Sequence, residues 1–225
     1  AQVTLAHDFF YDPGAHHALA RRVAGEGAVL LKNDAQILPL KASTRIALIG
    51  RFARSPRYQG AGSSLMNPTR LDNLYDELAK LTGETNLIYA PGYTEKGNAA
   101  DEALIQEALA AASQADVVVV CAGLTDMDEV EGIDRVHMQL PAGHAALIRR
   151  LAAANQKVVV VLSNGSPIEM PWVNDVSAIL EGYLGGQAGA GALADILTGK
   201  VNPSGKLAET FPVKLQDTLP YPYPG

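Results

Sequence analysis

Five carboxylates fall within nine residues of this 225-residue chain, and their types and spacing are the ones best suited to chemistry. They are Asp126, Asp128, Glu129, Glu131 and Asp134, and one arginine, Arg135, follows them. Carboxyl groups can give and accept protons, and an acid that works near neutral pH needs its pKa raised by burial or by a neighbouring negative charge. The competing interpretation is a hydrated acidic loop, because most runs of like charge are simply solvated.

The residues around the acidic run predict a loop at the end of a buried strand. Residues 117–122 (VVVVCA) are typical of a central strand in a parallel sheet, and a helical pattern begins after Leu140 and Pro141. The acidic run therefore follows the carboxyl end of a central strand. Open α/β sheets bind their ligands at this end of the sheet.

Predicted strands and helices alternate along the whole chain. Strands are expected at 45–50, 86–89, 117–122, 158–162 and 178–184, with shorter apolar pieces at 29–33 and 37–40. Helices are expected at 13–24, 71–81, 99–115 and 142–154, with a last one that ends at Leu197, and Asp12 is a candidate N-cap of the first. This alternation predicts an α/β fold, a three-layer α/β/α sandwich around a mostly parallel sheet of about six strands.

The predicted domain organisation is simple. Residues 1–12 are interpreted as a lead-in segment, residues 13–215 as one domain, and residues 216–225 as a linker or tail rich in proline and tyrosine.

Composition excludes several classes of partner. The net charge is −6 and no basic patch occurs, so nucleic acid is not expected as a partner. No apolar run approaches the roughly 20 residues needed to cross a bilayer, so no membrane partner is expected either. The single cysteine, Cys121, falls in a predicted buried strand and is interpreted as a core residue.

The remaining motif searches give no cofactor or metal site. The glycine stretches at 60–64, 186–191 and 199–206 lack the spacing and partner residues of phosphate-binding loops. A Gly-x-Ser-x-Gly nucleophile motif is absent, and the five histidines show no metal-ligand spacing. We expect neither a cofactor nor a metal, although a flavodoxin-like nucleotide binder stays open as an alternative.

Six motifs occur in an order that resembles a known family. They are LLKN at 30–33 with LPL at 38–40, QGAGSS at 59–64, EGIDR at 131–135 with LP at 140–141, NGSPIEMPW at 164–172, GGQAG at 185–189, and VNPSGKL at 201–207 with ETFP at 209–212. Together they resemble the second, (α/β)6-sandwich domain of glycoside hydrolase family 3, the family of β-glucosidases and β-xylosidases. The resemblance covers essentially residues 13–220.

The resemblance implies a division of labour between two domains. In the family, a (β/α)8 barrel supplies the aspartate nucleophile, and a glutamate on a loop of the sandwich domain serves as general acid/base. The motif places that glutamate at Glu131, with Glu129 as the alternative. The carboxylates Asp126, Asp128 and Glu129 are candidates to raise the pKa of the acid.

The resemblance also suggests roles for the flanking residues. Asp134 and Arg135 are expected to pair and hold the loop. Arg57, Gln59, Ser63 and Ser64 are candidate substrate-binding residues, with the interface to the barrel as the other interpretation.

The function implied is that of a retaining, exo-acting β-glycosidase, first of all a β-glucosidase, that takes terminal β-linked sugars from a β-glucoside or oligosaccharide. A family β-N-acetylhexosaminidase is a rival, and a non-catalytic carbohydrate-binding or structural module is a rival from another class. Nothing in the chain resembles the barrel, so the expected partner is a barrel domain of the same protein. We expect the chain alone to be inactive and residues 125–135 to be mobile without the barrel.

Overall fold

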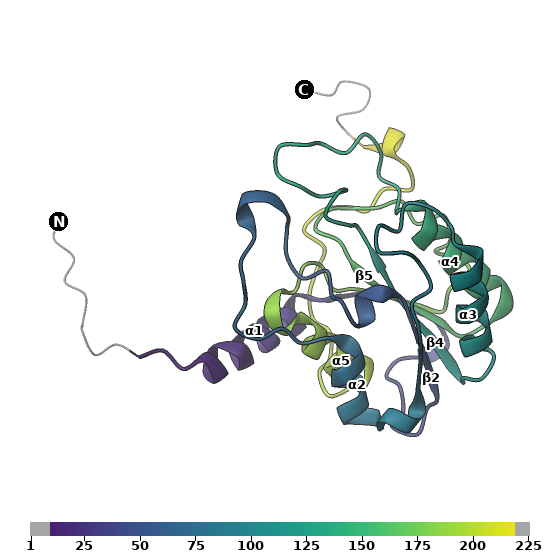
Figure 1. Cartoon of the computed structure of the whole chain (residues 1–225), viewed down its shortest axis with the longest axis horizontal. Helices are drawn as coiled ribbons and strands as arrows, with labels where there is room; N and C mark the ends of the chain where they lie inside the picture. Colours follow the sequence, from purple (N-terminus) through teal and green to yellow (C-terminus); the bar gives the residue numbers. More distant parts are fainter. Residues whose placement is uncertain (1–9, 219–225) are drawn as a thin grey trace.

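One six-stranded sheet forms the centre of the structure, a computed structural model that describes residues 10–218 (Figure 1). The strand order is β1-β6-β5-β4-β2-β3, and every neighbouring pair is parallel except β1 with β6. The strands are β1 (Val29–Asn33), β2 (Ile46–Ile49), β3 (Leu87–Ala90), β4 (Val117–Gly123), β5 (Val158–Ser163) and β6 (Ala178–Glu181). The predicted mostly parallel sheet is confirmed.

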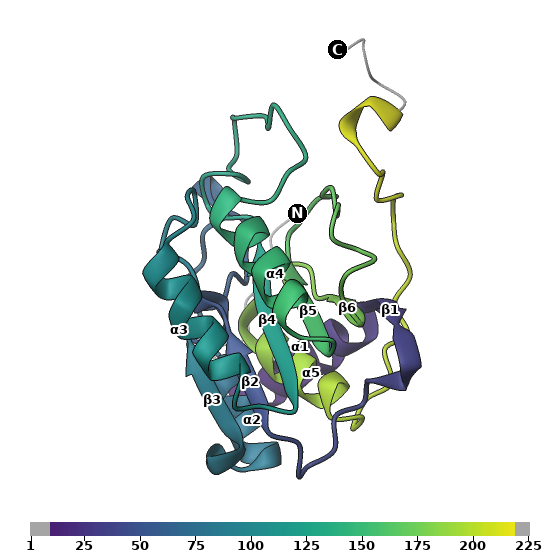
Figure 2. The same cartoon turned by 90° about the vertical axis from the view of Figure 1, so that its right-hand side faces the viewer.

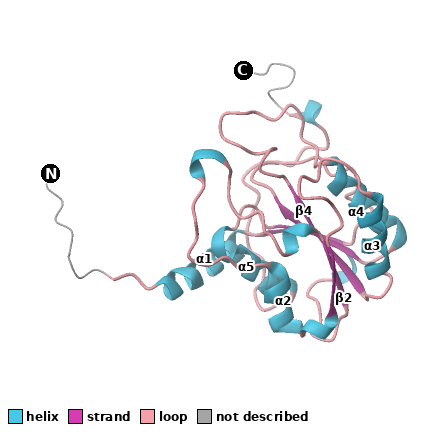
Figure 3. Ribbon diagram, in the orientation of Figure 1, coloured by secondary structure: helices cyan, strands magenta, loops and turns pink. Residues whose placement is uncertain are grey.

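Helices cover both faces of this sheet (Figures 1 and 3). The α-helices are α1 (Pro13–Gly27), α2 (Leu74–Thr82), α3 (Glu102–Ala112), α4 (Ala142–Ala154) and α5 (Gly189–Leu197). One buried apolar cluster joins the sheet to α3 and α4, and a second joins the opposite face to α2 and α5. Short 3₁₀ turns occupy Asp34–Gln36, Arg51–Ala53, Gly62–Ser64, Glu84–Asn86, Gly186–Ala188 and Leu215–Asp217. The architecture is the predicted three-layer sandwich.

Strand β4 shows why its sequence is continuously apolar. Val118 and Val120 belong to the cluster under α3 and α4, whereas Val119 and Cys121 belong to the cluster on the other face. Side chains alternate between the faces of a strand, so a strand covered on both sides needs apolar residues at every position. Burial raises the pKa of the Cys121 thiol to about 12, as suits a core residue rather than a nucleophile.

Several predicted boundaries agree with the structure, and capping side chains account for two helix starts that differ. Helix α4 has the predicted bounds, and Asp12 caps α1 as expected, because its Oδ1 accepts hydrogen bonds from the amides of Gly14 (2.8 Å) and Ala15 (3.2 Å). Helix α2 begins later than predicted because Asn73 caps it, and Asp101 likewise sets a later start for α3.

The last predicted strand, 178–184, was too long. Strand β6 ends at Glu181, and Tyr183 then has a φ of +51°, a left-handed conformation that no strand can contain. The chain turns there, away from the sheet.

The strand order creates a crevice between the carboxyl ends of β2 and β4. From β2 the chain moves to β3 on one side, and from β4 it moves to β5 and β6 on the other (Figure 2). The loops that leave β2 and β4 therefore start side by side, at the topological switch point where α/β sheets bind ligands. An isolated parallel bridge between Ala61 and Val130 joins these two loops.

The described residues stop short of both ends of the chain. The predicted lead-in and tail fall outside them at 1–9 and 219–225. Within 10–218, no helix has the length and apolar character needed to span a bilayer.

Candidate active site

Three loops at the carboxyl edge of the sheet form the candidate site. The β2–α2 loop comprises residues 50–73, the acidic loop residues 124–141, and the β5–β6 loop residues 164–177. The acidic loop carries the five carboxylates. The acidic loop leaves the sheet at the end of β4. It therefore lies between the other two loops, which leave the neighbouring strands β2 and β5.

Arg57 connects the β2–α2 loop to the acidic loop. Its side chain is buried, and its guanidinium pairs with Asp126 Oδ1 at 2.8 Å and donates to the carbonyl oxygens of Glu129 (3.2 Å) and Gln59. These partners all belong to the chain itself. In this structure Arg57 therefore holds the acidic loop against the β2–α2 loop and does not line the groove that contains Glu131.

Gln59, the second candidate for substrate binding, also has an internal role. Its Oε1 accepts from the amide of Met66 at 3.0 Å, and its Nε2 donates to the carbonyl of Met66 at 2.9 Å and to the Tyr58 hydroxyl at 2.7 Å. The Gln59 side chain thus donates to and accepts from the backbone of Met66, and this pair of hydrogen bonds closes the segment 59–66 into a ring. Ser63 and Ser64 lie on the exposed part of that ring.

Glu131 lies at the exposed tip of the acidic loop. The Ser63 hydroxyl donates a hydrogen bond to its Oε2, and Gly62 lies so close that a Cβ there would come within 3.2 Å of the Glu131 Cβ. Gly132 follows with a φ of +86°, a conformation that glycine adopts without strain. The Glu131 side chain is exposed at this turn.

Glu129, two residues earlier, is held by the β5–β6 loop. Both of its carboxylate oxygens lie 3.0 Å from the amide nitrogen of Gly165, and the Ser166 hydroxyl donates to Oε1 at 2.6 Å. The side chain is half-buried. The two glutamates that the sequence left as alternatives thus have different surroundings: Glu131 is exposed, and Glu129 is bound to backbone and hydroxyl donors.

Arg135 attaches the far end of the same segment to the same loop. Its Nη2 donates to the Ser166 hydroxyl at 3.0 Å and to the carbonyl of Pro167 at 2.8 Å. Asp134 is exposed, and within residues 10–218 it forms no ion pair with Arg135. The expected Asp134–Arg135 pair is therefore replaced by contacts of Arg135 with the β5–β6 loop.

Asp126 and Asp128, the first two carboxylates of the run, also have partners within the chain. Asp126 pairs with Arg57, as described above. Asp128 accepts from the amide and the hydroxyl of Thr125 at 2.8 and 2.7 Å, which closes a turn at the start of the loop. Both carboxylates thus shape the acidic loop.

The three loops enclose a groove of about 700 Å³ that contains the candidate acid. Its lining includes Ser63, Ser64, Glu131, Arg135 and Ser166. Four carboxyls, three hydroxyls and a guanidinium line this open groove, and such groups can bind a polyhydroxylated ligand and exchange a proton with it.

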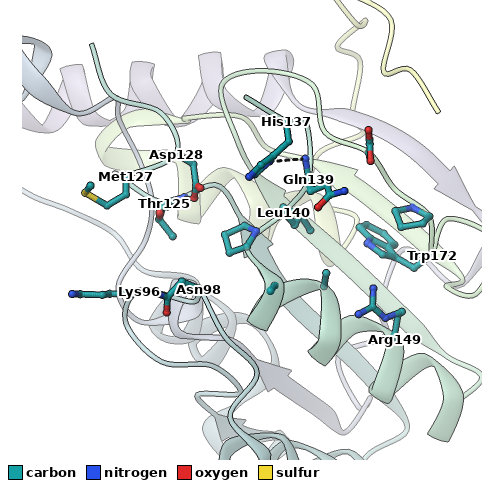
Figure 4. Close-up of a pocket in the computed structure, with 15 residues that line it drawn as sticks. Lys96, Asn98, Thr125, Met127, Asp128, His137, Gln139, Leu140, Arg149 and Trp172 are labelled. Atoms are coloured by element: carbon teal, nitrogen blue, oxygen red, sulfur yellow. Dashed lines mark hydrogen bonds between the residues drawn. The ribbon is translucent and has the colours of Figure 1, made fainter. Parts of the chain in front are cut away.

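A second cavity of about 750 Å³ lies where the acidic loop meets the start of α4 (Figure 4). His137, Leu140 and Trp172 line it, and Asp128 lines both cavities, but Glu131 belongs only to the first. His137 Nδ1 accepts from the amide of Gln139, two residues away, at 3.3 Å (Figure 4).

Sequence reasoning missed the side chains beneath the groove. Asn164 and Glu181 are fully buried, and Asn164 Nδ2 donates to Glu181 Oε2 at 2.9 Å and to the Ser166 carbonyl at 3.0 Å. Burial raises the pKa of Glu181 to about 8. The sequence signal that could have indicated this pair is Glu181, a charged residue at the end of an apolar strand. No group of three or more His, Cys, Asp or Glu side chains is arranged to hold a metal in the described part of the chain.

Comparison with known proteins identifies the domain. Residues 28–224 match the model of the glycosyl hydrolase family 3 C-terminal domain. The chain is 57% identical over 212 residues to the thermostable beta-glucosidase B of Acetivibrio thermocellus, and this match covers 94% of the chain and 28% of the relative. It is 46% identical over 220 residues to an exo-alpha-(1->6)-L-arabinopyranosidase of Bifidobacterium longum, covering 93% and 29%.

A solved structure agrees with these matches. The crystal structure of the GH3 beta-glucosidase of Bifidobacterium adolescentis superposes with a TM-score of 0.89 at 46% identity, over 94% of this chain and 31% of that one. The chain thus spans less than a third of the length of each of these relatives. It belongs to glycoside hydrolase family 3, and it is the family's C-terminal α/β-sandwich domain.

Proposed function

We propose that the protein carrying this chain is a retaining, exo-acting β-glycosidase, first of all a β-glucosidase, and that Glu131 is its general acid/base. The observation that supports this most directly is the contrast between the two glutamates. Both glutamates line the groove at the switch point of the sheet, but Glu131 is exposed, whereas Glu129 is half-buried and bound by Gly165 and Ser166, which it would have to leave to reach a substrate.

The proposed chemistry needs a second carboxylate from outside the chain. In a retaining glycosidase, the acid protonates the leaving oxygen while a carboxylate about 5–5.5 Å away attacks the anomeric carbon. We place that nucleophile, an aspartate, on a (β/α)8 barrel domain of the same protein. The barrel would close over the groove, and burial of a carboxyl in this way raises its pKa toward the value an acid catalyst needs. Glu131 would then activate the water that releases the sugar.

Ser63 and Ser64 stay as candidates for contact with the substrate. Ser63 also orients Glu131 through its hydrogen bond, so its hydroxyl would sit beside the scissile bond. Arg57 and Gln59 fit a supporting role better, because both side chains are bound within the chain's own loops.

The sugar specificity of the enzyme needs a different test from the identity of the acid/base residue. The relatives' names point to two substrates, a β-glucoside and an α-L-arabinopyranoside. The glycosidic bond is equatorial in both sugars, so the same acid/base can serve either. Comparison of kcat/KM for the two 4-nitrophenyl glycosides in the full-length enzyme distinguishes them.

The decisive experiment replaces Glu131 by alanine in the full-length enzyme. On aryl β-glucosides with poor leaving groups, kcat/KM should fall by on the order of 10²–10⁴-fold, because these need protonation. On a dinitrophenyl glucoside the loss should be small, and azide should restore turnover with release of β-glucosyl azide.

Two matched variants interpret this result. Glu107→Ala removes an exposed glutamate on α3 and should leave all rates unchanged. If Glu131→Ala retains full activity on poor leaving groups while Glu129→Ala loses it with azide rescue, the acid is Glu129. Full activity of both variants would make the domain a scaffold and end the proposal.

A further inference from the structure

The segment 129–135, which carries Glu131, is attached to the β5–β6 loop at both ends. Glu129 binds Gly165 and Ser166 on one side of Glu131, and Arg135 binds Ser166 and Pro167 on the other. Between these attachments the chain turns at Gly132, where φ is positive. Seven residues held at both ends by one short loop have far fewer accessible paths than a free loop of the same length.

The Ser166 hydroxyl is common to both attachments. It donates its proton to Glu129 Oε1 at 2.6 Å and accepts from Arg135 Nη2 at 3.0 Å. A hydroxyl has one proton to donate and two lone pairs to accept with, so a single side chain can bridge a carboxylate and a guanidinium in this way. Hydrogen bonds to charged groups are the stronger kind, which favours a fixed geometry.

The β5–β6 loop itself rests on buried groups. Asn164 Nδ2 donates to the Ser166 carbonyl and to Glu181 Oε2, and Glu181 Oε1 accepts from the amide of Tyr183 at 2.7 Å. Asn164 and Glu181 are both 0% exposed. The backbone that presents the Ser166 hydroxyl is therefore set from inside the sheet, at the end of β6.

We propose that Ser166 is a positioning residue, whose hydroxyl holds Glu129 and Arg135 and thereby fixes the place of Glu131 relative to the scissile bond. The inference rests on the proposed function of Glu131 and adds to it. Ser166 takes no proton from the substrate. Its removal leaves the acid present but displaced, and displacement of a catalytic group by about 1 Å can cost on the order of 10²-fold in rate.

The test uses the full-length enzyme with Ser166→Ala. The expected result is a loss of 10-fold or more in kcat/KM on a poor aryl leaving group and little loss on a dinitrophenyl glucoside, which needs no proton. Ser166→Thr keeps the hydroxyl and should restore most of the rate. Ser177→Ala is the matched control, because Ser177 also donates one hydrogen bond (to the Gln156 carbonyl, 2.7 Å) but lies before β6, at the other edge of the sheet.

A double-mutant cycle with Glu131→Ala separates positioning from general structural damage. If Ser166 acts through Glu131, Ser166→Ala should cost nothing further on the poor leaving group once Glu131 is absent. An equal cost in both backgrounds, or no cost in the wild-type background, overturns the inference. Full activity of Glu131→Ala by itself would instead overturn the proposed function, so the two failures are distinguishable.

Discussion

At the scale of single residues, the fold opposes the ionisation of Glu181. Burial raises the pKa of its carboxyl from 4.5 to about 8, hydrogen bonds from the Tyr183 amide and Asn164 lower it, and the charge of Glu129 raises it. Between pH 4.5 and 8 the folded state therefore holds a proton that the unfolded state has lost. Stability contributed by this group is present below pH 4.5 and is lost as the pH rises toward 8.

Replacement of this carboxyl by an amide should remove that pH dependence. The difference in free energy of unfolding between Glu181→Gln and wild type should grow in favour of the variant as the pH rises from 5 to 8, by at most about 1.4 kcal/mol per pH unit. Denaturant unfolding of the chain at several pH values measures it. A constant difference across this range would contradict the assigned pKa.

At the scale of elements, a buried ion cluster joins α1 to its neighbours. Arg21 on α1 binds Asp195 of α5 through Nε (2.7 Å) and Nη2 (3.0 Å) and also binds Glu77 of α2. Burial alone would raise the pKa values of Asp195 and Glu77, but hydrogen bonds from Arg21 and from the nearby lysines hold both below their usual range. Both carboxylates are nearly inaccessible to water.

Removal of the arginine should therefore destabilise the domain. Arg21→Met leaves two buried carboxylates with only a lysine each, and we expect a loss of about 3 kcal/mol in the free energy of unfolding. Arg22→Met is the matched control on the same helix: Arg22 is exposed and pairs with Glu26 at 3.7 Å, so its loss should stay within about 0.5 kcal/mol. Equal losses would show that the buried cluster contributes nothing specific.

The acidic loop is expected to combine fixed ends with a mobile tip. The amides of Asp128 and Glu129 donate to the Thr125 carbonyl at 3.0 and 3.2 Å, whereas residues 131–134 are exposed. In hydrogen exchange of the chain alone, we expect slower exchange at 128–129 than at 131–134. Strong protection across the whole of 125–135 would contradict the mobility predicted for this loop.

At the scale of the whole molecule, the proposed acid Glu131 needs a nucleophile from outside the groove. The groove lies at the switch point, and its described lining contains no aspartate or glutamate outside the acidic loop. We expect this chain alone to leave 4-nitrophenyl β-glucoside intact, while the full-length enzyme hydrolyses it. Measurable hydrolysis by the isolated chain that Glu131→Ala abolishes would show that the domain holds a complete site.

The sequence by itself determined the layers of the fold and the place of the acidic run within it. Strand β4 is apolar at every position and α4 begins after Pro141, so the acidic run between them could only be a loop at the carboxyl edge of the sheet. The motif then singled out Glu131. These features are local, because periodicity and capping act over a few residues.

Tertiary structure alone decided which side chains hold that loop. Arg57 lies 72 residues from the Glu129 carbonyl it binds, Ser166 lies 37 residues from the Glu129 carboxylate, and Glu181 lies below Asn164 on a neighbouring strand. The strand order brings these loops to one edge, and no local pattern encodes such pairings. This is why the sequence did not show that Arg57 and Gln59, candidates for substrate binding or for the barrel interface, bind their own loops, and why Ser166 was not singled out.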